Sequence, residues 1–175
     1  DFKCYPTSIY GKSKLLATKF LLKKSYENNF PVVVLRLFQA YGPFQDINRL
    51  IPIVIKGCIK NKSFACSSGY QLRDFIYIDD VINLILISIK NKNAKGNIFN
   101  VGLGKPKKVR QVIYDIRSIV NKGKPQFGKI KMRKDEIKNI YANINKAKKV
   151  LKWRPKTIFK KGIKKIINYY KKYGN

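Results

Sequence analysis

The segment from residue 31 to residue 38 places the strongest constraint on the fold of this chain. Pro31 opens the run Val32-Val33-Val34-Leu35-Arg36-Leu37-Phe38, which is short, rich in β-branched residues and followed by the turn signal Tyr41-Gly42-Pro43. A nearly continuous apolar run of this length is typical of a buried strand in a parallel sheet, where both faces are covered. Residues 9–28 before it have helical spacing of apolar side chains. A helix followed by a parallel-type strand predicts an α/β protein.

Helix and strand signals continue to alternate along the chain, without repeats or a long linker. The first helix carries its apolar face on Leu15, Leu16, Phe20 and Leu22, and the last on Phe159, Ile163, Ile166, Ile167 and Tyr170. Further helices are predicted at residues 50–60, 81–90, 109–120 and 147–153, and short strands at 64–66, 75–78 and 97–101. Asp79-Asp80 stands where the third helix needs an N-cap. Gly102-Leu103-Gly104 lacks the third glycine of a phosphate-binding loop, so it is interpreted as a turn.

The formal net charge of +30, from 39 basic and 9 acidic residues, raises the question of nucleic acid or an anionic surface as a partner. Of the basic residues, 32 are Lys and only 7 are Arg. Proteins that recognise bases in a DNA groove rely on Arg and on a recognisable DNA-binding module, and neither is prominent here. The excess of Lys is therefore interpreted as a solvated surface, which also suits an anionic small molecule.

The composition excludes several kinds of site. The chain has no His, and Cys4, Cys58 and Cys66 have no C-x-x-C spacing, which argues against structural zinc and against His-dependent nucleophiles. Three sparse cysteines predict reduced thiols in a cytoplasmic protein. No secretory signal is recognised, and the apolar run near residues 81–89 is too short for a bilayer.

Tyr10 and Lys14 form the strongest catalytic candidate. Four residues apart, they lie on one face of the predicted first helix. A neighbouring ammonium favours the phenolate form of a tyrosine, which suits the tyrosine to general acid/base catalysis. The spacing alone also fits an exposed helical pair without a function.

The context of this pair resembles a known family. Residues 6–14, PTSIYGKSK, are similar to the P-x-S-x-Y-G-x-S-K signature of the extended short-chain dehydrogenases, the NAD-dependent epimerase/dehydratase family. The segments that follow in the family's order are LRLFQAYGP at 35–43, RLIP at 49–52, RDFIYIDD at 73–80, FNVG at 99–102, MRKDE at 132–136 and AKKVLKWRP at 147–155. The resemblance covers nearly the whole chain.

The resemblance implies a role for each matching residue. Tyr10 would be the acid/base, Lys14 would hold the nicotinamide ribose, and Phe38 would lie near the nicotinamide of NAD or NADP. The substrate implied is a nucleotide-diphosphate sugar. Arg73 and Arg133 would bind its diphosphate, Glu136 its ribose, and Gln39, Arg49, Leu50, Phe64, Ala65, Cys66 and Asn100 would complete the pocket. Many relatives have Asn at the position of Gln39, which leaves that contact open.

Structural roles compete with these assignments at several positions. Leu50, Phe64 and Ala65 also fit a core, and the carboxylates at 79 and 80 fit a helix cap better than catalysis. Arg73 beside Asp74 also fits a surface ion pair, which contributes little energy.

By resemblance, residues 1–47 would end the dinucleotide-binding Rossmann domain and 48–175 would be mainly the substrate-binding domain, with residues near 75–101 returning to the Rossmann part. The family's glycine-rich loop and catalytic Ser/Thr precede Tyr10 and do not occur in these 175 residues. The chain is thus expected to be a fragment, an eroded gene product or half of a split pair, inactive without the other half of the Rossmann domain.

The parent chemistry implied is oxidation and reduction at sugar C4, leading to epimerisation, dehydration or keto reduction. Deoxysugar or surface-polysaccharide synthesis is the expected setting, and the family also implies a homodimer through the helix that carries Tyr10. The alternatives are a catalytically inactive remnant and a basic module associated with nucleic acid. Neither a membrane nor nucleic acid is the expected partner.

Overall fold

The computed structural model describes residues 4–132 and 136–173. Its helices are α1 (Ile9–Asn28), α2 (Leu50–Ile59), α3 (Ile78–Lys90), α4 (Val109–Val120), α5 (Asn145–Leu151) and α6 (Phe159–Tyr173), with a 3-10 turn, η1 (Lys92–Ala94). Its strands are β1 (Val33–Leu37), β2 (Gln39–Tyr41), β3 (Ser63–Cys66), β4 (Leu72–Arg73), β5 (Phe75–Tyr77), β6 (Asn97–Val101), β7 (Lys107–Lys108), β8 (Lys124–Phe127) and β9 (Asn139–Ile140). The predicted mixed α/β class is confirmed.

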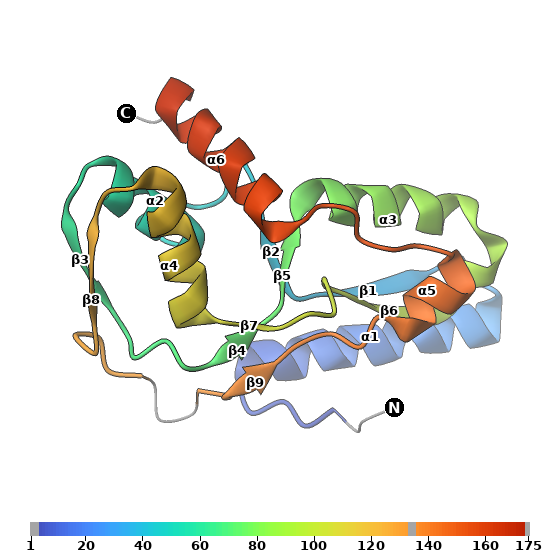
Figure 1. The fold of residues 1–175 in the computed structure, drawn as a ribbon. Coiled ribbons are helices and arrows are strands. Elements are labelled where there is room, and N and C mark those ends of the chain that lie inside the picture. Colours follow the sequence, from blue (N-terminus) through green and yellow to red (C-terminus); the bar gives the residue numbers. More distant parts are fainter. Residues whose placement is uncertain (1–3, 133–135, 174–175) are drawn as a thin grey trace.

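Most of the strand pairs are parallel. β1 pairs with β6, with Leu35 opposite Phe99, and β2 pairs with β5, with Ala40 opposite Ile76. β3 pairs in parallel with β8, while β4 lies between β7, which is antiparallel to it, and β9, which is parallel. In Figure 1, α1 and α3 run along opposite sides of the β1–β6 pair, and α2 and α4 stand beside β3 and β8.

The larger core lies where α2, α4 and α6 pack together. The side chains that α4 buries recur at helical spacing, as do those of α6, because each helix is apolar on one face only. The buried members from these three helices are Ile51, Val54, Ile55, Cys58, Val109, Val112, Ile113, Ile116, Phe159, Ile163, Ile166, Ile167 and Tyr170. The aromatic residues of β2 and β5 close this core, and Tyr41 packs edge-on against Tyr77 with ring centroids 5.6 Å apart.

A smaller core lies around the β1–β6 pair. Phe99 and Val101 of β6 are fully buried there with Leu84 of α3 and Trp153, which follows α5. The other three residues of β6 are half-buried. The run at 32–38, predicted to be a buried strand, forms β1, which is only half-buried and leaves Leu37 exposed. The proposed division of the chain at residue 47 stays a prediction.

The first helix differs from expectation. Its bounds agree with the predicted residues 9–28, but none of its described residues is buried, and Leu16 and Phe20 are 66% and 60% exposed. Of the apolar face predicted from the sequence, Leu16 and Phe20 are exposed, while Leu15 and Leu22 are half-buried.

The predicted cap of the third helix is wrong. α3 begins at Ile78, its N-cap position is Tyr77, and Asp79 and Asp80 lie within its first turn. The Asp80 carboxylate instead accepts the N–H groups of Lys156 and Thr157 at 2.9 and 3.0 Å. Buried beside the positive end of α3, it anchors the segment that leads into α6. Within the described ranges, no helix combines the length and hydropathy that crossing a bilayer requires.

Candidate active site

Tyr10 and Lys14 lie together on the accessible first turns of α1. Ser8 begins the helix, since its extended backbone and its Oγ, which accepts the Gly11 N–H at 3.0 Å, form an N-cap. The Tyr10 side chain is 71% exposed, and Lys14 Nζ lies 5.4 Å from the centroid of its ring. The predicted spacing thus brings the phenol and the ammonium together, while their catalytic role stays a prediction.

Phe38 and Gln39 follow the carboxyl end of β1. The Phe38 N–H donates to Val101 O of β6 at 3.0 Å, and the Gln39 N–H donates at 3.0 Å to the O of Asp74, which precedes β5. At these two residues the hydrogen-bond partner of the chain therefore changes from β6 to the segment that begins β5. Phe38 is half-buried and Gln39 is exposed. The carboxyl ends of parallel strands are where α/β sheets commonly bind ligands, and a contact of Phe38 with a cofactor stays a prediction.

The expected pocket residues of α2 and β3 divide into two groups. Arg49, at the N-cap position of α2, and Ala65 are exposed. Leu50 and Phe64 are half-buried against the larger core, and Cys66 is buried in it. The core interpretation therefore holds for Leu50 and Phe64 but not for Ala65, and contacts of all five with a ligand stay predictions.

Arg73 is buried, with 7% of its surface exposed, and its charge is paired within the protein. Its Nη1 donates to Leu72 O at 2.7 Å, and its Nη2 forms an ion pair with Glu136. The surface pair with Asp74 that the sequence allowed is absent from the salt bridges of the described residues. Arg73 and Glu136 do lie together, so a diphosphate that approaches Arg73 meets a guanidinium already held by a carboxylate. Arg133 lies outside the described residues.

Asn100, the remaining expected pocket residue, lies in β6 and is half-buried. Its Nδ2 donates to Asn143 O at 3.4 Å, which joins β6 to the segment before α5. This contact is structural, and a role in the pocket stays a prediction.

Asp74, which the sequence suggested only as a surface partner of Arg73, is fully buried and accepts three backbone N–H groups. The donors are Leu103 at 2.7 Å, Gly104 at 2.9 Å and Ala142 at 3.0 Å. The G-x-G segment thus forms a turn, as predicted, and the anion that its N–H groups bind is a carboxylate of the same chain. An acidic residue just before a strand and a G-x-G just after another were the only signals for this contact.

The phenols of the larger core are unsuited to proton transfer. Burial, followed by the charge of Asp80, raises the pKa of Tyr41, and burial and the charge of Asp79 raise the pKa of Tyr77. The Tyr41 hydroxyl donates to Phe159 O at 3.4 Å. Tyr10, in contrast, is exposed and lies beside the Lys14 ammonium.

Residues 1–102 match the family described as the NAD dependent epimerase/dehydratase family. The chain belongs to this family. The chain is 33% identical over 141 residues to CDP-abequose synthase of Salmonella typhimurium, which covers 77% of this chain and 47% of that protein. It is 32% identical over 171 residues to a putative UDP-glucose 4-epimerase of Methanocaldococcus jannaschii, with coverage of 95% and 54%. The chain spans about half the length of these curated relatives.

The fold is shared with solved members of the family. The UDP-glucuronic acid 4-epimerase of Bacillus cereus, solved with UDP-glucuronic acid and NAD, superposes with a TM-score of 0.89 at 28% identity. The superposition covers 98% of this chain and 55% of that one. The mixed α/β arrangement therefore matches family epimerases over about half of their length.

Proposed function

We propose that this chain is the C-terminal part of an NAD(P)-dependent enzyme that acts on a nucleotide-diphosphate sugar by oxidation and reduction at sugar C4. The observation that carries the proposal is the exposed Tyr10–Lys14 pair on the first turns of α1, in a chain of the epimerase/dehydratase family. Tyr10 would exchange a proton with the C4 oxygen, and Lys14 would hold the phenol and the cofactor ribose in place.

The residues present fit one end of the cofactor. Bound NAD(P) would supply the exchange of a hydride with the sugar. The Tyr10 hydroxyl and the Lys14 ammonium are accessible hydrogen-bond donors suited to ribose oxygens, and Phe38 offers an apolar ring at the carboxyl end of β1. A pyrophosphate requires the glycine-rich turn at a helix N-terminus, which is not among the 175 residues. That turn would have to come from the other half of a Rossmann domain.

The setting we propose is deoxysugar or surface-polysaccharide synthesis. The likeness to CDP-abequose synthase supports this setting, since that relative is named as the synthase of a CDP-linked sugar. The catalytic residues described above do not choose between epimerisation, dehydration and keto reduction.

The experiment compares the 175-residue chain alone with the same chain fused behind the N-terminal half of the Methanocaldococcus relative. Titration calorimetry with NAD should detect micromolar binding by the fusion and none by the chain alone, because the pyrophosphate contacts position the nicotinamide. Micromolar binding by the chain alone would show that the cofactor site is misplaced. A folded fusion that binds neither NAD nor UDP-glucose would favour an inactive remnant.

A further inference from the structure

A concave site lies away from the residues expected to act on a sugar. It is a cavity of about 630 Å³ between the loop that follows β6, the C-terminal half of α4 and the linker from α5 to α6. None of the described residues that the family resemblance places in the active site lines it. Its volume is within the range of about 300–1,000 Å³ that small-molecule sites occupy.

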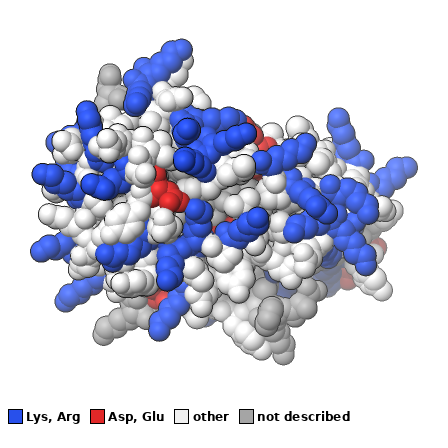
Figure 2. All heavy atoms as spheres, viewed as in Figure 1, with Lys and Arg blue, Asp and Glu red and all other residues white. Residues whose placement is uncertain are grey.

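The walls of this cavity, called here the linker cavity, are strongly basic. Lys and Arg supply six of its fifteen lining residues, against 39 of the 175 in the chain, so the enrichment exceeds what composition alone gives. The six are Lys105, Lys107, Lys148, Arg154, Lys156 and Lys160. Figure 2 shows Lys and Arg spread over this face, with few acidic side chains among them.

Asp115 is the acidic residue in the lining, and it is already engaged. It accepts from Lys107 Nζ at 2.7 Å and from Gln111 Nε2 at 2.8 Å. Among the described residues, no carboxylate forms an ion pair with the other five basic side chains of the cavity. Five cations around one hollow favour a ligand with at least two negative charges, such as a phosphate dianion.

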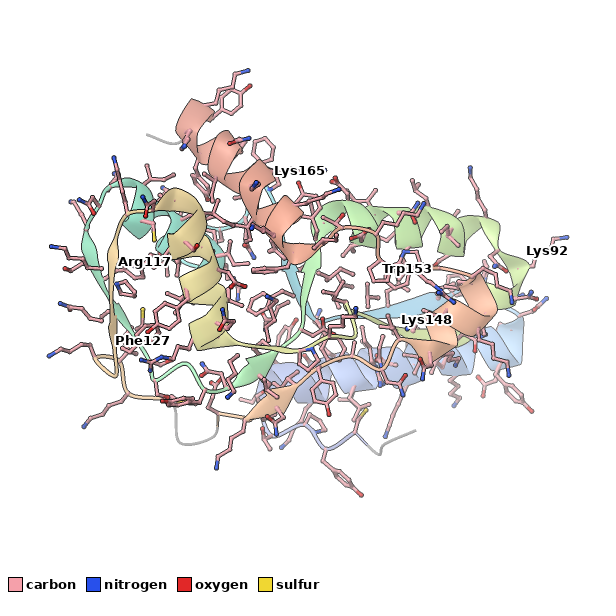
Figure 3. The ribbon with its side chains drawn as sticks, viewed as in Figure 1. Lys92, Arg117, Phe127, Lys148, Trp153 and Lys165 are labelled. Atoms are coloured by element: carbon pink, nitrogen blue, oxygen red, sulfur yellow. The ribbon has the colours of Figure 1, made fainter. Side chains whose placement is uncertain are left out.

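Most of the remaining lining is apolar, with Ser118 and Thr157 as its neutral polar members. Leu103, Ile119, Ile144 and Phe159 contribute to it, and the first turn of α6 adds the positive end of a helix dipole. The linker that forms one wall is fixed by Asp80, which accepts the N–H groups of Lys156 and Thr157. In Figure 3, Lys148 lies on α5, from which this linker leads to α6. A site fixed in advance loses little entropy on binding.

We propose that the linker cavity binds a small organic phosphate whose phosphate meets the lysines and whose apolar body lies against the cavity wall. The cations line a hollow, whereas duplex nucleic acid would need an extended strip of basic residues that follows its backbone. The site would serve as a second ligand site in addition to the proposed sugar-nucleotide site.

The test uses phenyl phosphate as the probe, since it joins a phosphate to a ring and lacks the nucleotide that the active site would take. Calorimetry of the 175-residue chain in 150 mM salt should show it binding more tightly than inorganic phosphate. The variant Lys148→Gln/Arg154→Gln/Lys156→Gln should weaken binding by about tenfold or more, the scale of lost charge-assisted hydrogen bonds.

The matched control is Lys149→Gln/Lys152→Gln/Lys161→Gln, which removes the same charge from exposed neighbours outside the cavity lining. It should change affinity less than twofold. Equal weakening by both triple variants, equal affinity for inorganic phosphate, or no binding of phenyl phosphate would each overturn the proposal. The proposal would also be overturned if duplex DNA bound the parent chain and lost affinity only in the cavity variant. If a triple variant fails to fold, Lys148→Gln against Lys149→Gln makes the same comparison.

Discussion

Gly102 lies so close to Asp74 that a Cβ atom at residue 102 would stand 2.5 Å from Asp74 Oδ2. The same carboxylate accepts the N–H groups of Leu103, Gly104 and Ala142. One buried side chain thus joins the start of β5 to the turn after β6 and to the segment before α5. The glycine is required by this approach of backbone to carboxylate.

The first prediction is that Gly102→Ala destabilises the chain by about 1–3 kcal/mol, the usual cost of forcing an extra group into a packed site. Besides Asp74, the added methyl would meet Ala142 Cβ at 2.6 Å, so two neighbours must move. Urea unfolding followed by circular dichroism measures the loss. Gly128→Ala is the control, since nothing lies within 4 Å of its Cβ position and only its φ of +82° opposes the change. A loss no larger than in this control would contradict the packing argument.

The second prediction concerns the ion pair between Arg73 and Glu136. Because the guanidinium is buried, a double-mutant cycle with Arg73→Leu and Glu136→Gln should give a coupling energy above about 1 kcal/mol. The exposed i,i+4 pair Lys23–Glu27, with its charged atoms 3.6 Å apart, is the matched control and should give about 0.5 kcal/mol or less. Similar coupling energies in the two cycles would show that the burial of Arg73 does not strengthen its ion pair.

The third prediction concerns the three thiols. Burial raises the pKa of Cys58 to about 11 and also raises the pKa of Cys66, whereas Cys4 is exposed. Since the thiolate is the reactive form, a disulfide reagent at pH 8 should modify one thiol rapidly and the other two slowly. All three should react rapidly in denaturant. Rapid modification of all three thiols under native conditions would mean that the reagent reaches the core around α2 and β3.

The fourth prediction is that the variant Tyr41→Phe gains stability relative to the wild type as the pH rises above 10. Burial raises the pKa of Tyr41 above its ordinary value of 10.0, so above pH 10 the unfolded wild type releases a proton that the folded state keeps. The unfolded state then binds fewer protons, and the free energy of unfolding falls as pH rises.

Phenylalanine removes this loss, so the stability of the variant relative to wild type should rise by up to about 1.4 kcal/mol per pH unit above 10. The difference between the two proteins is the quantity to measure, because deprotonation of the lysines affects both alike. A difference that stays constant from pH 8 to pH 11 would argue that Tyr41 is accessible to solvent.

The sequence predicted those features that depend on neighbours along the chain. The observed bounds of α4 and β6, Val109–Val120 and Asn97–Val101, are the predicted ones, since apolar spacing decides both elements. The two-residue strands β4, β7 and β9 were missed, because so short a strand is defined by its partner. In the candidate site, the Tyr10–Lys14 pair followed from helical spacing. The Arg73–Glu136 pair and the Asp74 contacts join residues far apart in sequence, which local patterns do not encode.

The last prediction tests the residue on which the proposed chemistry depends. In the active fusion, Tyr10→Phe should lower turnover by about 10²-fold or more, the scale of lost general acid/base catalysis, with little change in substrate affinity. Phenylalanine keeps the ring beside the Lys14 ammonium and removes only the hydroxyl, so the helix should be unaffected. Tyr26→Phe is the matched control, because Tyr26 lies on the same helix and is 92% exposed. Steady-state kinetics should give that variant the turnover of the parent. If Tyr10→Phe also retains turnover within threefold of the parent, the proton is moved by another group, and the exposed pair on α1 is only a feature of its surface.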